Sequence, residues 1–101
     1  MSAINIENES FQSEVMESEK PVLLDFWAPW CGPCRTVVPI VEEIALERSD
    51  IKVGKVNVDE QKELARQFKV MSIPTLVVIK NGEVAARSVG AKSKEEILAM
   101  L

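Results

Sequence analysis

The sequence lacks histidine altogether and has only two cysteines among its 101 residues. Without histidine, no imidazole can act as a general base. A zinc site needs four ligands, so two cysteines could support one only if two copies of the chain shared the metal. A covalently attached haem needs a histidine after the second cysteine, where Arg35 stands instead. We therefore expect neither a metal nor a bound cofactor.

Long apolar runs and clusters of positive charge are also missing. No stretch approaches the roughly 20 apolar residues of a membrane span, and no basic run accompanies aromatic residues as in nucleic-acid-binding proteins. The net charge is −4. The first residues lack the basic and apolar regions of a secretory signal, which favours the cytoplasm, although a mature organellar protein without its transit peptide would look the same. We expect neither nucleic acid nor a membrane as a partner.

The composition fits a single α/β domain over residues 1–101, which we expect to be a monomer. Apolar residues make up 47% of the chain, which is enough for one core at this length. Strand and helix patterns alternate in the order βαβαβαββα, and the two βαβ units predict parallel strands. The expected strands cover residues 3–6, 21–27, 51–58, 75–80 and 83–89, and the expected helices cover residues 8–18, 33–48 and 60–68 and the segment after residue 93.

Local signals mark several ends of these elements. Asn8 or Ser10 is expected to cap the first helix. Pro39 falls inside the second helical pattern and should bend it. Asn81-Gly82 predicts a two-residue hairpin turn, in which both residues need a positive φ. Ser93, with a glutamate three residues later, predicts a capping box at the last helix. The hairpin makes the predicted sheet mixed, with helices on both of its faces.

Cys31 and Cys34 form a C-x-x-C motif between a buried strand pattern and a helix, which is the most informative feature of the chain. Two thiols at this spacing can form a disulfide and release it again. A purely structural disulfide is the alternative, but closing so short a loop contributes only about 2 kcal/mol, against about 3 for a 15-residue loop. The spacing therefore favours redox chemistry.

The chain resembles the thioredoxin family over nearly its whole length. The segments that carry the resemblance are Asp25-Phe26-Trp27-Ala28, Trp30-Cys31-Gly32-Pro33-Cys34, Pro39, Lys55-Val56-Asn57-Val58-Asp59, Ser72-Ile73-Pro74-Thr75, Asn81-Gly82 and Val89-Gly90-Ala91. The resemblance implies the thioredoxin fold, with a central mixed five-stranded sheet flanked by four helices. It also implies a protein-disulfide reductase that carries electrons on a Cys31–Cys34 disulfide and receives them from a thioredoxin reductase.

Within this resemblance, four residues are expected to carry the chemistry. Cys31, at the N-terminal end of the helix, is the expected nucleophile, because the helix dipole favours a thiolate there. Cys34 is the expected resolving thiol. Asp25 lies in an apolar run that should raise its pKa, and it could accept the Cys34 proton. Lys55, on the neighbouring strand, is expected to pair with Asp25 and tune it.

Around the sulfurs, an apolar patch is expected to bind extended, disulfide-containing protein substrates. The resemblance implies a cis peptide bond before Pro74, which would present the Ile73 backbone as a docking edge. The expected patch consists of Trp30, Gly32, Pro33, Ile73, Pro74, Gly90 and Ala91. Two other functions stay open for the same fold. One is a disulfide oxidant or isomerase, and the other is a redox-silent binding module that uses this patch.

Overall fold

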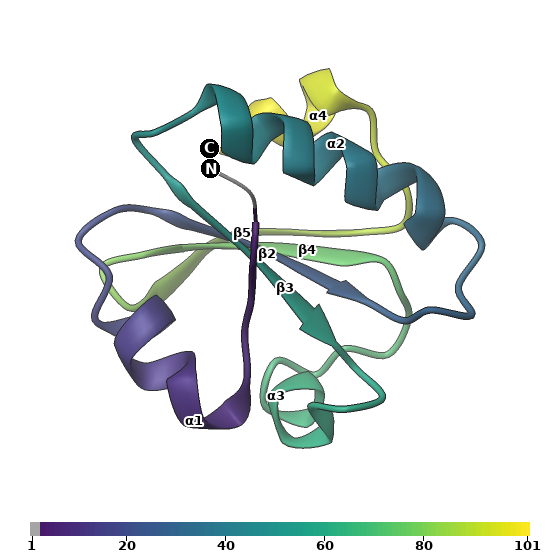
Figure 1. The fold of residues 1–101 in the computed structure, drawn as a ribbon, viewed down its shortest axis with the longest axis horizontal. Helices are drawn as coiled ribbons and strands as arrows, with labels where there is room; N and C mark the ends of the chain where they lie inside the picture. Colours follow the sequence, from purple (N-terminus) through teal and green to yellow (C-terminus); the bar gives the residue numbers. More distant parts are fainter. Residues whose placement is uncertain (1–2) are drawn as a thin grey trace.

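A computed structural model describes residues 3–101 of the chain. Its centre is a five-stranded sheet in the order β1-β3-β2-β4-β5, with helices on both faces (Figure 1). The elements, in chain order, are β1 (Ile4–Asn5), α1 (Asn8–Phe11), the π-helical turn η1 (Gln12–Met16), β2 (Val22–Trp27), α2 (Cys34–Glu47), β3 (Lys52–Asn57), α3 (Lys62–Gln67), β4 (Thr75–Lys80), β5 (Glu83–Val89) and α4 (Lys94–Leu98). The predicted order of elements is confirmed, with α1 and η1 together forming the first helix.

The sheet is mixed, as the sequence predicts. Strand β3 runs parallel to both β1 and β2, whereas β4 is antiparallel to β2 and to β5. Trp27 at the end of β2 pairs with Asn57 at the end of β3, and Phe26 pairs with Thr75 at the start of β4. The segments after β2, after β3 and before β4 therefore meet at one edge of the sheet.

Alternation along β2 divides the core into two layers. Val22, Leu24 and Phe26 belong to a cluster that includes side chains of α1 and α3. Leu23 belongs to the opposite cluster, which includes side chains of α2 and α4. Figure 1 shows these two pairs of helices on opposite sides of the sheet. Because side chains alternate between faces, Asp25 lies on the same face as Leu23, toward α2.

The predicted hairpin turn and the predicted cap of the last helix are confirmed. Asn81 and Gly82 have φ values of 53° and 77°, both positive as this turn requires. Before α4, the Ser93 hydroxyl accepts a hydrogen bond from the Glu96 backbone N–H at 3.1 Å, and Glu96 Oε1 accepts one from the Ser93 N–H at 2.9 Å. These local motifs depend only on residues close in sequence, so they could be predicted directly.

The predicted cap of the first helix is wrong. The N-cap residue is Glu7, and neither Asn8 nor Ser10 occupies that position. Ser10 instead uses its hydroxyl to accept a hydrogen bond from the Glu7 backbone N–H at 3.1 Å. A serine at the third helical position can thus accept a hydrogen bond from the N–H of the N-cap residue, so the helix begins earlier than its serine suggests.

Candidate active site

Cys31 and Cys34 form a disulfide at the beginning of α2. Their sulfurs lie 2.26 Å apart, and their Cα atoms are separated by 5.3 Å. Cys31 lies in the loop between β2 and α2, and Cys34 is the first residue of α2. The Cys34 backbone N–H donates to Cys31 Sγ at 3.2 Å. A helix N-terminus has unpaired N–H groups, so this position favours negative charge on Cys31 sulfur when the disulfide is open.

Both sulfurs are nearly inaccessible in the oxidised protein. Cys31 is 4% exposed and Cys34 is 1% exposed. Cys31 lies between the exposed residues Trp30 and Gly32, whereas Cys34 also lines a cavity of about 260 Å³ beside Pro39. The environments of the two sulfurs differ, which suits an attacking thiol and a protected second thiol.

The segment before β4 faces the disulfide. The peptide bond between Ile73 and Pro74 is cis, as the family resemblance implies. The Ile73 carbonyl oxygen lies 3.8 Å from Cys31 Sγ, and Ile73 packs against the buried cluster that contains both cysteines. Behind it, the Gly90 backbone N–H donates to the Pro74 carbonyl at 2.8 Å. The segment before β4 therefore contacts Cys31 and is itself bonded to the residue that follows β5.

The expected substrate-binding residues differ in how far they are exposed. Trp30 is 67% exposed, and Gly32, Pro33 and Ala91 are also exposed. Ile73 and Gly90 are half-buried, and Pro74 is buried. Trp30, Gly32 and Pro33 belong to the cysteine loop, and Ile73 and Pro74 belong to the segment before β4. Gly90 is bonded to Pro74, and Ala91 follows Gly90 in the chain. The arrangement leaves an exposed, mostly apolar rim around the nearly buried Cys31.

Asp59 was not predicted to have a role, but it holds the largest residue of this rim. The Trp30 indole N–H donates to Asp59 Oδ2 at 2.9 Å. Asp59 is the second residue after β3, at the sheet edge where the cysteine loop begins. The predicted order of elements could have indicated that Asp59 lies near Trp30, because the ends of neighbouring parallel strands meet at one edge of the sheet.

Asp25 is a buried carboxyl group without a hydrogen-bond partner among the described residues. It is 0% exposed, and neither of its oxygens is bonded. Burial raises the pKa of Asp25 to about 7, from an ordinary value of 3.8, and the positive charge of Lys55 opposes that rise only in part. The predicted rise in pKa is confirmed. A carboxyl group with a pKa near 7 can both bind and release a proton at neutral pH.

The predicted pairing of Lys55 with Asp25 is wrong. Lys55 lies beside Asp25 in the register of β2 and β3, but its Nζ donates to Glu42 Oε2 at 2.8 Å. The other Glu42 oxygen accepts the Ala3 backbone N–H at 2.8 Å. Burial acts to raise the pKa of Glu42, but these hydrogen bonds bring it below its ordinary value. Glu42 therefore holds the ammonium group, which affects Asp25 only through its charge.

Within residues 3–101, no group of three or more cysteine, aspartate or glutamate side chains is arranged to hold a metal ion. Over the same residues, none of the helices has the length and apolar character needed to cross a membrane.

The comparisons with known proteins agree on one family. The family model for thioredoxin matches residues 2–101. A thioredoxin of Mycobacterium tuberculosis strain H37Rv is 52% identical over 96 residues, which cover 94% of this chain and 83% of the relative. A thioredoxin of Bacillus subtilis strain 168 is 49% identical over 98 residues, covering 96% and 92% of the two chains. A bifunctional thioredoxin reductase/thioredoxin of Mycobacterium leprae is 49% identical over 96 residues, which cover 94% of this chain and 21% of the relative.

Proposed function

Because this chain belongs to the thioredoxin family, we propose specific roles for its residues in reducing protein disulfides. The chain is a thiol–disulfide oxidoreductase that carries electron pairs on Cys31 and Cys34. The observation that most strongly supports the proposed roles is the position of Cys31. Its sulfur lies at the helix N-terminus, 3.8 Å from the Ile73 carbonyl oxygen and beside the exposed rim.

In the first step, the Cys31 thiolate attacks one sulfur of a substrate disulfide. The substrate S–S bond breaks, one substrate thiolate leaves, and a mixed disulfide joins Cys31 to the substrate. Binding of the substrate backbone along Ile73 would align the three sulfurs for this displacement. Trp30, Gly32, Pro33, Pro74, Gly90 and Ala91 supply the rest of the proposed contact surface.

In the second step, the Cys34 thiolate attacks Cys31 Sγ and releases the second substrate thiolate. The Cys34 thiol must lose a proton before it attacks, and we assign that proton to Asp25, directly or through water. Asp25 suits the role because its pKa of about 7 allows it to accept a proton at neutral pH. This step forms the Cys31–Cys34 disulfide that the structure contains. Two electrons and two protons must then be supplied to reduce it for the next cycle.

We assign the supply of electrons to a thioredoxin reductase. The Mycobacterium leprae relative carries both activities in its name, which supports such a pairing for this chain. Lys55 is proposed to influence Asp25 by its charge alone, because its ammonium group is bound by Glu42. A monomeric state and a cytoplasmic location stay predictions from the sequence.

The direct test is reduction of insulin in the presence of NADPH and a bacterial thioredoxin reductase. The wild-type chain should accelerate NADPH consumption catalytically, and Cys31→Ser should abolish the acceleration. Leu46→Ser, at an exposed position on α2 outside the proposed contact surface, serves as a control. Stable complex formation without turnover by the wild type would support a binding module instead. Net oxidation of reduced protein thiols under the same conditions would support an oxidant.

A further inference from the structure

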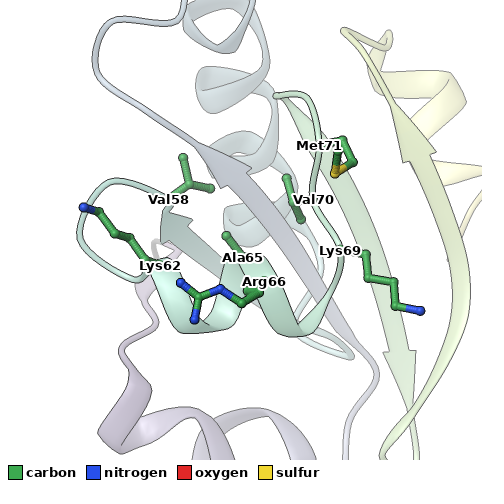
Figure 2. A pocket seen from close by; sticks show the side chains of 7 residues that line it. All are labelled: Val58, Lys62, Ala65, Arg66, Lys69, Val70 and Met71. Carbon is green, nitrogen blue, oxygen red and sulfur yellow. The ribbon is translucent and has the colours of Figure 1, made fainter.

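A groove beside the active site combines an apolar floor with a basic rim. We call it the basic groove; its volume is about 680 Å³. The floor consists of Val58, Ala65 and Val70, the exposed Met71 also lines the groove, and the cationic residues are Lys62, Arg66 and Lys69. Figure 2 shows Val58, Ala65 and Val70 between Lys62 and Lys69, whose side chains extend toward opposite ends. The volume is in the range of clefts that bind ligands or peptide side chains.

The basic groove is continuous with the active-site rim. A neighbouring recess of about 410 Å³ is lined by Trp30, Ser72 and Ile73 and shares Val58, Val70 and Met71 with the groove. Met71, which lines both the recess and the groove, is 93% exposed. A segment that docks along Ile73 can therefore extend over Met71 into the groove without leaving the surface.

The charge of the groove is opposite to that of the whole chain. The chain has 16 acidic and 12 basic residues, yet three basic residues and no acidic one line this groove. Within residues 3–101, Lys62, Arg66 and Lys69 form no ion pair, whereas Lys52, Lys55 and Lys94 each pair with a carboxylate. Three unpaired cations around an apolar floor are complementary to an acidic segment that carries an apolar residue.

The backbone at Lys69, one of the basic residues of the groove, is held in a defined conformation. Lys69 has a φ of 55°, in the left-handed region where glycine is favoured at the end of a helix. The Arg87 guanidinium donates to the carbonyl oxygens of Phe68 and Lys69, which holds this end of α3 in place. Replacing Lys69 by glycine would consequently remove the charge without disturbing the local backbone.

We propose that the basic groove binds an acidic segment of the protein whose disulfide is being reduced. One apolar side chain of that segment would lie on the floor formed by Val58, Ala65 and Val70. Its carboxylates would pair with Lys62, Arg66 and Lys69. This proposal rests on the proposed function and adds a preference among substrates: disulfides flanked by acidic residues are reduced faster than those with neutral flanks.

The test compares two synthetic disulfide peptides that differ only in their flanks. One carries glutamates around a leucine, and the other carries glutamines at the same positions. Dithiothreitol supplies the electrons and its uncatalysed rate is subtracted, so that the measured kcat/KM reports on the peptide and not on a reductase. For the wild type at low salt, we expect the acidic peptide to be favoured about tenfold. Raising the salt should reduce this preference, because exposed charges are screened.

The variant is Lys62→Gln combined with Arg66→Gln. We expect it to lower kcat/KM for the acidic peptide about fivefold and to leave the neutral peptide within twofold of wild type. The matched control is Lys20→Gln combined with Lys80→Gln, which changes the net charge equally at the opposite end of β2 and β4 and should preserve the preference. Lys69→Gly, which preserves the local backbone, should lower the acidic rate about twofold.

Each outcome decides one question. Equal rates for the two peptides in the wild type would overturn the basic groove as a binding site and leave the reductase function intact. The same would follow if the control lowered the acidic rate as much as the variant does, because net charge alone would then explain the effect. If neither peptide were reduced faster than by dithiothreitol alone, the proposed function itself would fail.

Discussion

Replacing Asp25 by asparagine should stabilise the oxidised protein, and the gain should grow with pH. Asp25 is fully buried and has no hydrogen-bond partner among the described residues, so its ionised form is unfavourable in the folded state. The pKa of Asp25 is about 7 in the folded protein, against 3.8 for an ordinary aspartate. Asparagine has nearly the same shape and carries no charge at any pH in this range.

The sign and size of the effect follow from proton linkage. Between pH 3.8 and about pH 7, the unfolded chain has released the Asp25 proton and the folded chain still holds it. The unfolded state thus binds fewer protons, and the free energy of unfolding falls as pH rises through this window. At about 1.4 kcal/mol for each pH unit, the loss reaches about 4 kcal/mol above pH 7. Asp25→Asn should recover this amount at pH 8 and little of it at pH 4.

Denaturant unfolding of the oxidised wild type and of Asp25→Asn at pH 4 and pH 8 measures this difference. Asp50→Asn is the control, because Asp50 is exposed and its hydrogen bond with Arg48 lowers its pKa to about 2. The ionised Asp50 contributes stability above pH 3.8, so removing it should give no gain that grows with pH. A pH-independent effect of Asp25→Asn would refute the reasoning that burial holds Asp25 protonated.

Three further predictions concern other parts of the molecule. Cys34→Ser should accumulate a mixed disulfide between Cys31 and substrate, detected as an adduct by mass spectrometry; recovery of free protein alone would contradict the resolving role. Glu42→Gln should free the Lys55 ammonium group for Asp25, lower the Asp25 pKa and so reduce the loss of stability between pH 4 and pH 8; Glu43→Gln, which removes a partner of Lys94 instead, should leave that loss unchanged. Gly54→Ala should destabilise the protein by about 1–3 kcal/mol, because the added Cβ would lie 2.6 Å from Ile6 Cγ1. Gly32→Ala, where no atom beyond the neighbouring residues in the chain lies within 4 Å of the added Cβ, should change stability little, and equal losses for the two glycines would count against the packing argument.

Much of the site could be predicted because it depends on patterns within short segments. Alternation along β2 is enough to bury Asp25, and the C-x-x-C spacing brings Cys31 and Cys34 within bonding distance at the helix N-terminus. The cis bond before Pro74 was expected only from the resemblance to the thioredoxin family. It could not have been derived from the local sequence, because most X-Pro bonds are trans.

At the site, the errors concern side chains whose partners are far apart in the sequence. Lys55 was expected to pair with Asp25, its neighbour in the sheet, but Glu42 reaches the same ammonium group from α2. The sequence shows that both carboxylates exist and does not show which one the long lysine side chain will reach. The bond between Trp30 and Asp59 was missed for the same reason, since the two residues meet only once the sheet edge has formed.

The basic groove lies beside the active site, where it can influence which disulfides reach Cys31. An exposed, mostly apolar active-site rim can accept many disulfides, so charged surfaces around it are needed to discriminate among substrates. The groove beside α3 is continuous with that rim through Met71 and carries unpaired positive charge in an acidic protein. Preference for acidic flanks would thus be set outside the chemical centre, where it can change without altering Cys31 or Asp25.

A redox titration of the intact protein tests the central claim most directly. Equilibration in glutathione buffers of defined potential, followed by alkylation and mass spectrometry, counts the free thiols at each potential. The account predicts one two-electron transition in which the Cys31–Cys34 pair goes from no alkyl groups to two, with a tenfold change in the reduced-to-oxidised ratio for each 30 mV or so. A count that stays constant across physiological potentials would contradict it, since the pair would then carry no electrons.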